Sequence, residues 1–377
     1  METTQAAVTE LMTEMGHEQV VFVADAPSGL RAVIAVHSTA LGPSLGGIRF
    51  WRYASEREAL VDALRLSEAM SLKAAAAGLH QGGGKAVVLC DDPDAPRGEP
   101  LLRAMGRAID ELGGRYIAAE DVGATPRDMQ IIASETPWVT GIEGHGGSGD
   151  PSPVTAYGVV CAMQAVLEEL DGDPSLVGKR VVVDGVGHVG SHLARLLADA
   201  GARVAVADVN ADRVDTLVRE VGADALAVEA ALEEPCDVLA PCALGAALSE
   251  STIPRLQCRA VCGAANNQLA DAAADHALAA RGILYAPDFV VNAGGIINLA
   301  EEFVGYDRDK ALKRTAQIGE TVCRVFALAR ESGGPPGHAA EEMARRRIAE
   351  EGGGRRWVPG DPAAWTNGAA LRTLRPA

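Results

Sequence analysis

The sequence predicts an α/β protein of two domains, and three observations support this. The chain of 377 residues is longer than one hydrophobic core usually needs. From residue 158 onward, apolar strand patterns alternate with helical patterns, which is typical of a parallel sheet covered on both faces. Residues 144–153 are dense in glycine and proline. We therefore expect a first domain over 1–148, a second over 149–330, and a C-terminal helical segment and tail over 331–377.

The composition is that of a soluble globular protein with small-molecule partners. The chain is 48% hydrophobic and 23% charged, with a formal net charge of −17 and a pI near 4.9. Nucleic acids and anionic membranes attract a surplus of lysine and arginine, so we expect neither as a partner. We see no signal peptide and no apolar run of bilayer length. The seven cysteines are scattered without metal-ligand spacing, so we expect no metal site and a reducing, cytoplasmic location.

The first domain is expected to begin with a hairpin and a long helix. Residues 19–37 contain two β-branched apolar runs around a Pro-Ser-Gly turn, which predicts the hairpin. Ser55 and Glu58 have the spacing of a capping box, and apolar residues at helical spacing continue from there. This helix should end near Gly78 and carry Lys73 in its last turns.

The next elements bring further polar residues to strand ends. A glycine loop at 82–84 is expected to lead into a strand over Lys85–Leu89. A helix around 98–112 and a strand over Arg115–Ala119 follow, and Asp121 stands at the C-terminal end of that strand. Thr125-Pro126 predicts the start of another helix, because proline at the first helical position loses no hydrogen bond.

The second domain carries a dinucleotide-binding pattern. A strand over Arg180–Asp184 runs into Gly185-Val186-Gly187-His188-Val189-Gly190 and then a helix, and the next strand, residues 203–207, ends on Asp208. Further buried strands are expected at 236–242, 258–264 and 283–287, and a helix after residue 333. Glycines between a strand and a helix let the backbone approach a pyrophosphate, and the acidic residue binds ribose hydroxyls and repels a 2′-phosphate. The pattern predicts a Rossmann domain that binds NAD rather than NADP.

Lysine is rare in this chain, so its positions are informative. Arginine supplies most of the positive charge, and lysine occurs only at 73, 85, 179, 310 and 313. Unlike arginine, a partly buried lysine can lose its proton. The glycines at 82–84 do not form a Walker loop with Lys85, because no Ser or Thr follows and the lysine opens a strand. They form either a turn or a place where backbone crowds a ligand.

Several motifs, in order along the chain, carry a family resemblance. They are LGPSLGGIRF (41–50), MSLKAAAAGLHQGGGKAVV (70–88), AAEDVGAT (118–125), GDPSPVTAYGV (149–159), GVGHVG (185–190), APCALG (240–245), CGAANNQLA (262–270) and APDFVVNAGGIIN (286–298). With these motifs the chain resembles the Glu/Leu/Phe/Val dehydrogenases, which oxidatively deaminate L-amino acids, and among them it looks closest to the branched-chain members. The resemblance implies a homo-oligomer built through an N-terminal substrate-binding domain, with C-terminal helices returning toward it.

The resemblance also implies site residues. Lys85 matches the family's catalytic base, and Asp121 matches the aspartate that exchanges protons with the substrate amine. Lys73, Gly46, Gly47 and Asn292 match the groups that bind the substrate carboxylate, while Leu45, Ala118, Thr140 and Val291 match the side-chain pocket. The matching cofactor contacts are Gly185, Gly187, His188, Val189, Gly190, Asp208, Thr155, Cys242, Ala243, Asn266 and Asn267. Desolvation and repulsion between two lysines in one cleft would favour a neutral amine at Lys85.

Substrate choice is partly readable. Glutamate-using relatives carry a lysine where this chain has Leu45, so a second carboxylate would stay unpaired and glutamate should be rejected. The resemblance implies an apolar branched-chain substrate, with valine favoured and leucine or isoleucine as alternatives. An aromatic or unusual apolar amino acid and a non-catalytic NAD sensor remain as rival readings. Leu72 and Ala74 beside Lys73, and Asp184 and His188 at the glycine turn, depart from the family's pattern.

Overall fold

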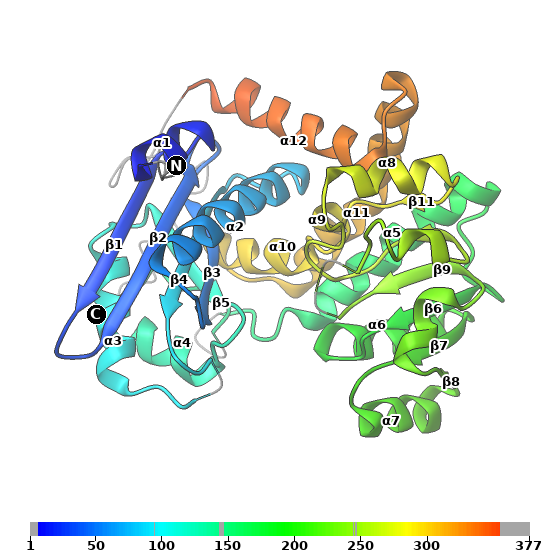
Figure 1. Cartoon of the computed structure of the whole chain (residues 1–377), viewed down its shortest axis with the longest axis horizontal. Coiled ribbons are helices and arrows are strands. Elements are labelled where there is room, and N and C mark those ends of the chain that lie inside the picture. The colour runs from blue at the N-terminus through cyan, green and yellow to red at the C-terminus, as the bar shows by residue number, and fades with distance from the viewer. Residues whose placement is uncertain (1–6, 94, 143–146, 244, 246, 355–377) are drawn as a thin grey trace, which may run out of the picture. The chain divides into compact units, whose positions relative to one another are not determined.

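A computed structural model of the chain describes residues 7–93, 95–142, 147–243, 245 and 247–354. The chain divides into two compact units, both α/β (Figure 1). The first unit contains the described residues up to Gly149, Leu299–Tyr306 and the described residues from Ala344 to Gly354. The second contains Asp150–Asn298 and Asp307–Met343. The predicted two-domain α/β class is confirmed, and the last described turns of the chain belong to the first unit.

The first unit is built on a five-stranded mixed sheet in the order β1-β2-β4-β3-β5. β1 pairs with β2, and β2 with β4, in antiparallel fashion, whereas β3 is parallel to both β4 and β5. The predicted hairpin is therefore present, while β3 is a central strand that the sequence analysis did not predict. The elements are α1 (Val8–Glu14), β1 (Gln19–Asp25), β2 (Leu30–Ser38), β3 (Ser44–Trp51), α2 (Glu56–Ala76), β4 (Gly82–Leu89), α3 (Glu99–Asp110), β5 (Tyr116–Glu120) and α4 (Pro126–Ala133).

Local capping signals set the helix starts. The Ser55 hydroxyl accepts a hydrogen bond from the Glu58 backbone N–H at 3.1 Å, as a helix N-cap should. The Glu58 carboxylate, however, accepts from the Ala54 N–H at 2.7 Å, which differs from the reciprocal bond that a capping box makes. At α4, Thr125 and Asp128 do form the complete box, and Pro126 occupies the first helical position. Both helix starts were predicted correctly.

The glycine run at 82–84 is part of β4, and the prediction of a loop there is wrong. These glycines are needed because other atoms of the first unit lie so close to the strand that a side chain would collide with them. A Cβ at Gly83 would lie 2.1 Å from Ser71 N and 2.4 Å from Ser67 O, both in the backbone of α2. A Cβ at Gly84 would lie 2.6 Å from the Tyr116 ring. The glycines thus let α2 pack directly on the sheet, and Lys85 lies in the middle of a strand rather than at its start.

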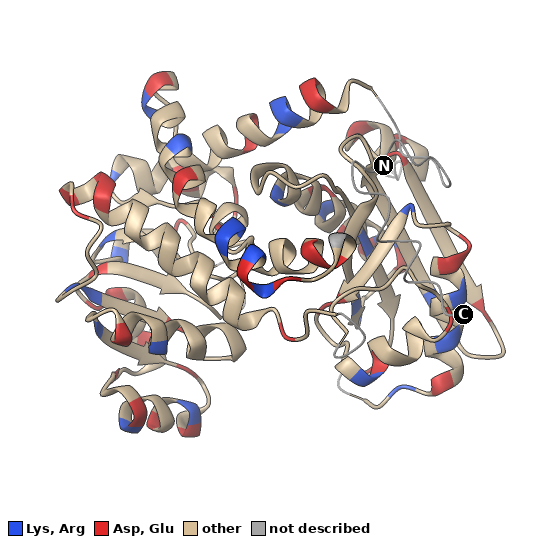
Figure 2. Ribbon diagram, turned by 180° about the vertical axis from the view of Figure 1, so that it is seen from behind, with Lys and Arg blue, Asp and Glu red and all other residues tan. Residues whose placement is uncertain are grey.

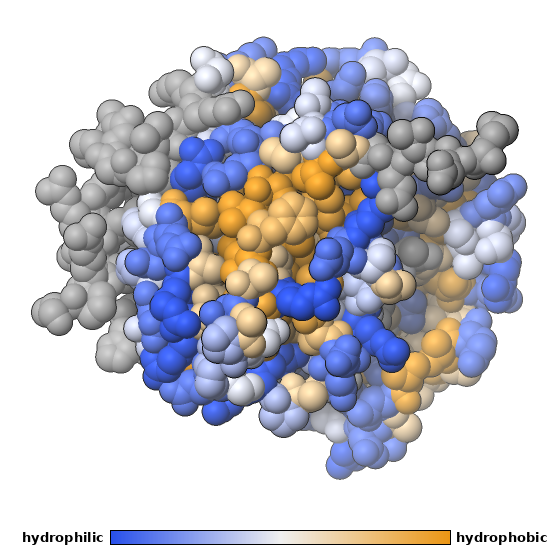
Figure 3. Space-filling model, turned by 60° about the vertical axis from the view of Figure 1, so that its left-hand side comes forward, coloured by the Kyte–Doolittle hydropathy of each residue, from blue (hydrophilic) through white to orange (hydrophobic). Residues whose placement is uncertain are grey.

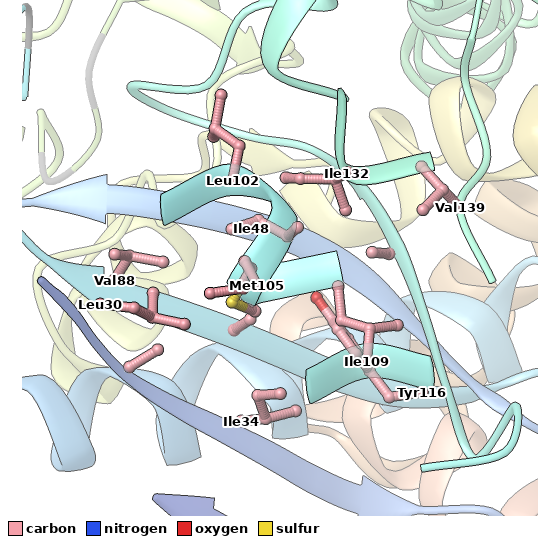
Figure 4. Packing of buried hydrophobic residues seen from close by; sticks show 14 of the residues in the cluster. Leu30, Ile34, Ile48, Val88, Leu102, Met105, Ile109, Tyr116, Ile132 and Val139 are labelled. Carbon is pink, nitrogen blue, oxygen red and sulfur yellow. The ribbon is translucent and has the colours of Figure 1, made fainter. Parts of the chain in front are cut away.

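The two faces of this sheet are covered differently. α2 packs on β2 and β4, where Val33, Ala35 and Val87 meet Leu60 and Leu64. On the other face, α3 and α4 cover a second apolar cluster (Figure 4). Among its labelled members are Ile34, Ile48, Met105, Ile109 and Tyr116. Because side chains alternate along strands, Leu45, Gly47 and Arg49 share the α2 face with Lys85.

The second unit is a doubly wound parallel sheet in the order β11-β10-β9-β6-β7-β8. The strand order reverses at β6, which lies between β9 and β7, and ligands of such folds bind where it reverses. Its strands and first helices are α5 (Ser152–Asp171), β6 (Arg180–Asp184), α6 (His188–Asp199), β7 (Arg203–Ala207), α7 (Ala211–Val221), β8 (Asp224–Ala225), η1 (Val228–Glu233), β9 (Cys236–Pro241), η2 (Ile253–Arg255), β10 (Cys258–Val261), α8 (Ala272–Ala280) and β11 (Leu284–Tyr285). The predicted Rossmann pattern is confirmed.

The last third of the chain contributes segments to both units. It contains α9 (Asp288–Val291), α10 (Gly294–Ala300), η3 (Glu301–Val304), α11 (Arg308–Ser332) and α12 (Pro336–Gly352). The backbone N–H of His338 at the start of α12 donates to Asp275 in the second unit, at 3.1 Å. Later in the same helix, Arg345 pairs with Glu68 at 2.7 Å and Arg347 donates to the Ala75 carbonyl at 2.9 Å, both in α2. These contacts explain why the end of α12 groups with the first unit.

The surface carries mixed charge with local apolar areas. Figure 2 shows acidic and basic residues interspersed along the helices, α7 among them. Figure 3 shows an apolar area on one face, bordered by hydrophilic residues. In the first unit, Phe22 on the edge strand β1 is 54% exposed. Among the described residues, no helix is both long enough and apolar enough to span a bilayer.

Candidate active site

Two predicted catalytic residues meet in the first unit. Lys85 in β4 and Asp121, directly after β5, form an ion pair with 2.7 Å between Lys85 Nζ and Asp121 Oδ2. The strands alone do not bring them together, since β3 separates β4 from β5. The gap is bridged at Gly47 in β3, where a Cβ would lie 2.5 Å from Asp121 Cβ. Glycine at this position therefore allows the carboxylate to cross β3 toward the lysine.

The Lys85 amine is buried and the Asp121 carboxylate is part-buried, and this affects the pKa of both groups. The Lys85 side chain is 6% exposed and that of Asp121 is 21% exposed. Burial lowers the pKa of the Lys85 amine, although the Asp121 charge opposes this. For Asp121, burial acts to raise the pKa, but the charges of Lys85 and Arg49 outweigh it and lower the pKa to about 2. The result is a firmly ionised carboxylate beside an amine that gives up its proton more easily than an ordinary lysine.

A third charged residue, Arg49, completes this cluster, and the sequence analysis did not assign it. Its Nε atom lies 3.0 Å from the same Asp121 oxygen, and its Nη1 atom lies 3.2 Å from Asp62 in α2. Tyr53 donates a hydrogen bond to that Asp62 carboxylate at 2.7 Å. A signal was present, because an arginine two residues after Gly47 in an apolar segment must share that glycine's face if the segment is a strand.

The predicted carboxylate-binding groups lie in two places. Lys73 is part-buried in the last turn of α2, whose backbone rests on the glycines of β4. Gly46 lies in β3 between Gly83–Gly84 and Ala118, and a Cβ there would lie 1.7 Å from the Gly84 carbonyl oxygen. Asn292 lies in the second unit. The structure thus places Lys73, Gly46 and Gly47 around the strand that carries Lys85.

The residues predicted to line the side-chain pocket lie on different faces of the sheet and in different units. Leu45 is fully buried on the α2 face of the sheet. Ala118 belongs to the core under α3 on the opposite face, whereas its neighbour Ala119 shares the face of Lys85. The assignment of Ala118 to the side-chain pocket stays a prediction. The Thr140 hydroxyl donates to Glu302 at 2.5 Å, and Val291 is buried in α9 of the second unit.

Glu302 is a further polar residue that the sequence analysis missed. Besides Thr140, its carboxylate accepts hydrogen bonds from the backbone N–H groups of Gly141, at 3.1 Å, and Ser148, at 2.7 Å. It therefore ties the segment that leaves the first unit to the segment that returns to it. The only sequence signal was an acidic pair, Glu301 and Glu302, after an apolar helix, which is not distinctive.

The glycine turn of the second unit has the shape that a dinucleotide needs. Gly185 adopts φ +100°, which disfavours any side chain, and a Cβ at Gly190 would lie 2.0 Å from the Gly185 carbonyl oxygen. Gly187 precedes α6 and faces open space, where a Cβ would meet nothing within 4 Å. This is a backbone concavity at a helix N-terminus, and it fits a pyrophosphate. His188 and Val189 start α6, with His188 exposed.

The predicted cofactor residues after β7 and β9 adjoin this turn. Asp208 accepts hydrogen bonds from the backbone N–H groups of Val186, at 2.7 Å, and Asn210, at 2.8 Å. The N–H groups of Cys242 and Ala243 donate to the Asp184 carbonyl at 2.7 and 2.9 Å. Burial and the nearby Asp208 charge raise the pKa of Asp184. Hydrogen bonds therefore connect the glycine turn to Asp208, and Asp184 to the loop after β9. All of these residues lie where the strand order reverses.

The remaining predicted residues of the second unit cluster around α9. The Asn292 amide donates to Asn266 Oδ1 at 2.8 Å and to the Ala264 carbonyl at 3.1 Å. Its own Oδ1 atom is buried and accepts no hydrogen bond from the part of the chain that is described. Asn267 adopts φ +53°, and Thr155 in the first turn of α5 donates to the Pro151 carbonyl at 2.9 Å. Asn292 therefore joins α9 to the 262–270 loop.

Metal binding has no support in the described part of the chain, where no group of three or more His, Cys, Asp or Glu residues could hold an ion. The first unit holds instead an amine–carboxylate pair, and the second unit holds, by itself, a glycine turn of the dinucleotide-binding kind. Such a set is suited to proton transfer at a small substrate and to hydride exchange with a nicotinamide.

Comparisons with known proteins identify the family of the chain. Residues 17–138 match the family described as Glu/Leu/Phe/Val dehydrogenase, dimerisation domain. Residues 146–212 and 208–314 match the family described as Glutamate/Leucine/Phenylalanine/Valine dehydrogenase. Together these matches span most of the chain, and they include the glycine turn and the Lys85–Asp121 pair.

Individual relatives cover nearly the full length. The chain is 48% identical to a leucine dehydrogenase of Thermoactinomyces intermedius, over 90% of this chain and 93% of that protein. It is 50% identical to a valine dehydrogenase of Streptomyces albus, over 89% of this chain and 93% of the relative. Among solved structures, L-tryptophan dehydrogenase from Nostoc punctiforme is similar with a TM-score of 0.80 and 40% identity, covering 91% of this chain and 99% of that one.

Proposed function

Because the chain belongs to the Glu/Leu/Phe/Val dehydrogenase family and is an amino acid dehydrogenase, we propose that it oxidatively deaminates an apolar branched-chain L-amino acid with NAD. The products are the 2-oxo acid and ammonia, and the reaction is reversible as reductive amination. Valine is favoured, with leucine and isoleucine as further substrates. The observation that carries this proposal is the buried Lys85–Asp121 ion pair at 2.7 Å.

The pair suits both proton transfers of a deamination. When bound, the nicotinamide ring supplies the hydride acceptor for the substrate Cα. Lys85, whose pKa is lowered by burial, takes the proton of the water that attacks the resulting iminium. Asp121, ionised with a pKa of about 2, exchanges protons with the substrate amine and the departing ammonia. Lys73 holds the substrate carboxylate. Because the base must be unprotonated, deamination has an alkaline optimum.

NAD is the proposed cofactor rather than NADP. Asp208 follows β7, and its carboxylate is anchored to the glycine turn through the Val186 N–H at 2.7 Å. A carboxylate fixed there accepts hydrogen bonds from ribose hydroxyls and repels a 2′-phosphate. The Gly185–Gly190 turn would hold the pyrophosphate of the cofactor, and Cys242 and Ala243 adjoin that turn.

The side-chain preference rests on relatives and on Leu45. The identities to a valine and a leucine dehydrogenase, 50% and 48%, are too similar to separate the two substrates. Leu45 supplies no charge for a second carboxylate, which disfavours glutamate. An aromatic substrate is the second candidate, and the 40% identity to an L-tryptophan dehydrogenase favours it.

A homo-oligomer is part of the proposal, because the matched N-terminal family is described as a dimerisation domain. Light scattering on the purified protein should give a mass at least twice the 39.0 kDa of one chain. A purely monomeric mass at micromolar concentration would exclude it.

A panel of L-amino acids assayed for reduced cofactor at alkaline pH tests the function directly. Valine, leucine, isoleucine, phenylalanine, tryptophan and glutamate are each compared with NAD and with NADP. We expect the highest kcat/KM with valine or leucine and NAD, and none with glutamate. Activity greatest with tryptophan or phenylalanine would replace the branched-chain assignment by the aromatic one. Silence across the panel with intact NAD binding would favour a sensor.

A further inference from the structure

Arg49 connects the site carboxylate to helix α2. Its backbone pairs with Val87 in β4, and its side chain runs along the face that carries Lys85. The guanidinium contacts Asp121 through Nε at 3.0 Å and Asp62 through Nη1 at 3.2 Å. It thus joins two carboxylates from different elements, and its side chain is only 22% exposed.

Asp62 is itself held in place. Its Oδ2 atom, which Arg49 contacts, also accepts a hydrogen bond from the Tyr53 hydroxyl at 2.7 Å. Its other oxygen lies 3.5 Å from Arg65 Nη2, and the Arg65 side chain is 67% exposed. Asp62 therefore provides a part-buried anchor that fixes the direction of the Arg49 guanidinium.

We propose that Arg49 is a positioning residue of this site, which fixes the Asp121 carboxylate against Lys85 and makes the Lys85 amine easier to deprotonate. The inference rests on the proposed function, because that function assigns proton transfer to Lys85 and Asp121. Arg49 acts through these two groups and has no contact with the substrate in this scheme. It fulfils two needs at once, since one cation both orients the carboxylate and repels the neighbouring ammonium.

The charges around Lys85 act in opposite directions. Burial is the largest influence and lowers the pKa of Lys85, and the Arg49 charge also lowers it. Asp121 and Asp62 raise it. The two phenols nearby stay neutral, because burial raises the pKa of both Tyr53 and Tyr116. Lys73 lies near the far end of the helix that carries Asp62.

These signs lead to opposite predictions for the two partners. Removing the Arg49 charge should raise the pKa of Lys85. The rising part of the curve of deamination rate against pH, called the ascending limb below, should therefore move to higher pH. Removing the Asp62 charge should move it to lower pH. If Arg49 and Asp62 were only structural contacts, losing either would lower the protein yield or kcat. It would not shift the rate–pH curves of the two variants in opposite directions. Arg49 and Lys85 both contact Asp121 Oδ2, and a single charge this close shifts a pKa by about one unit.

The experiment measures kcat against pH for wild type, Arg49→Gln, Arg49→Lys and Asp62→Asn. Arg49→Lys keeps the charge but loses the forked geometry, so we expect a limb near that of wild type with a lower plateau. Arg31→Gln is the matched control, since Arg31 is also a strand arginine paired with a carboxylate of α2, Glu56, at 2.7 Å but with 60% exposure. Thermal unfolding of each variant reports folding separately. The control should keep the wild-type profile.

The outcomes separate the two proposals. A wild-type enzyme that is inactive on every amino acid removes the proposed function and this inference with it. An active wild type with an ascending limb that Arg49→Gln leaves unmoved overturns the inference alone, as does a shift of Arg49→Gln and Asp62→Asn in the same direction. If Arg49→Gln does not fold, Asp62→Asn and Arg49→Lys decide, and an unmoved Asp62→Asn limb overturns the inference.

Discussion

At the scale of single residues, the burial of one lysine distinguishes the site, because the chain has only five lysines. Lys85 is almost completely buried, while Lys310 is 68% exposed on α11. The burial of the Lys85 amine is tolerated because Asp121 supplies the counter-charge at 2.7 Å. The same burial makes the amine a usable base, which an exposed lysine is not.

Lys73 gives the first prediction, because a fixed cation that binds a carboxylate contributes mainly to affinity. Lys73→Ala should raise the KM for the amino acid about tenfold to a hundredfold, as expected for loss of a charge-assisted hydrogen bond. Steady-state kinetics at saturating NAD measure it. Lys313→Ala, which removes an exposed lysine, is the control and should keep the wild-type KM. A KM unchanged in Lys73→Ala would refute the carboxylate-binding role.

The sequence indicated some of these residues and not others, for a physical reason. Lys73, Lys85 and Asp121 lie in distinctive motifs and carry chemistry that few other residue types supply. The role of Arg49 appears only when β3 lies between β4 and β5 and α2 lies above it, because its partners, Asp62 and Asp121, are 13 and 72 positions away. Pairing at such separations is not readable from one sequence.

At the scale of elements, close contact between α2 and β4 positions the site, and Gly83 makes that contact. Gly83→Ala would place a methyl group 2.1 Å from Ser71 N and 2.4 Å from Ser67 O, which forces α2 away from the strand. We expect a loss of unfolding free energy of about 1–3 kcal/mol, as for overpacking elsewhere. Urea denaturation measures it.

A glycine without such neighbours serves as the control. Gly98 has a φ of −69°, and a Cβ there would meet only Pro100 Cδ, at 3.7 Å. Gly98 is the N-cap of α3, where alanine is less favourable than glycine, so Gly98→Ala should lose at most about 1 kcal/mol. Equal stability of the two variants would show that α2 does not need bare backbone beneath it.

The sequence predicts the boundaries of an element where neighbouring residues determine them. It misses them where packing against a distant part of the chain determines them. Ser55 and Thr125 cap helices through atoms three residues away, so the sequence alone identifies both starts. The glycines at 82–84 look like a loop, and only the α2 backbone lying on them shows why a strand needs them. β3 was missed because Gly46 and Gly47 interrupt its apolar pattern.

At the scale of the whole molecule, the chain returns to its first unit twice, at Leu299–Tyr306 and again within α12, and the second return depends on partners far away in the sequence. The sequence suggested a separate C-terminal segment from residue 331, whereas the first unit regains the chain at Ala344, in the middle of α12. The reason is that Arg345 and Arg347 bind Glu68 and the Ala75 carbonyl, more than two hundred residues earlier. Helical periodicity carries no information about such contacts.

Two buried histidines make the stability of the molecule depend on pH. His17 and His37 stack edge to face at 4.8 Å under α2, where His37 Nδ1 lies 2.7 Å from Ser71 Oγ. Burial, and then repulsion from His17, lowers the pKa of His37 to about 4. The unfolded chain binds this proton near pH 6.5 and the folded one does not, so stability is full above 6.5 and falls toward pH 4.

We therefore expect the unfolding free energy to drop by about 3 kcal/mol between these pH values through His37 alone. Denaturant titrations at several pH values measure the slope, and His37→Gln should flatten it. His80, which is exposed, provides the control, and His80→Gln should leave the slope unchanged. If the unfolding free energy of His37→Gln depends on pH as steeply as that of wild type, groups other than His37 cause the loss of stability in acid.

The most direct test of the account is the turnover of Lys85→Ala with the preferred branched-chain amino acid and NAD at alkaline pH. We predict that kcat falls by about 10²–10⁴, as for loss of a general base, while KM changes little. Lys310→Ala, which alters an exposed lysine, should retain wild-type turnover. A Lys85→Ala enzyme with the kcat and alkaline optimum of wild type would contradict the assignment of this buried amine as the base.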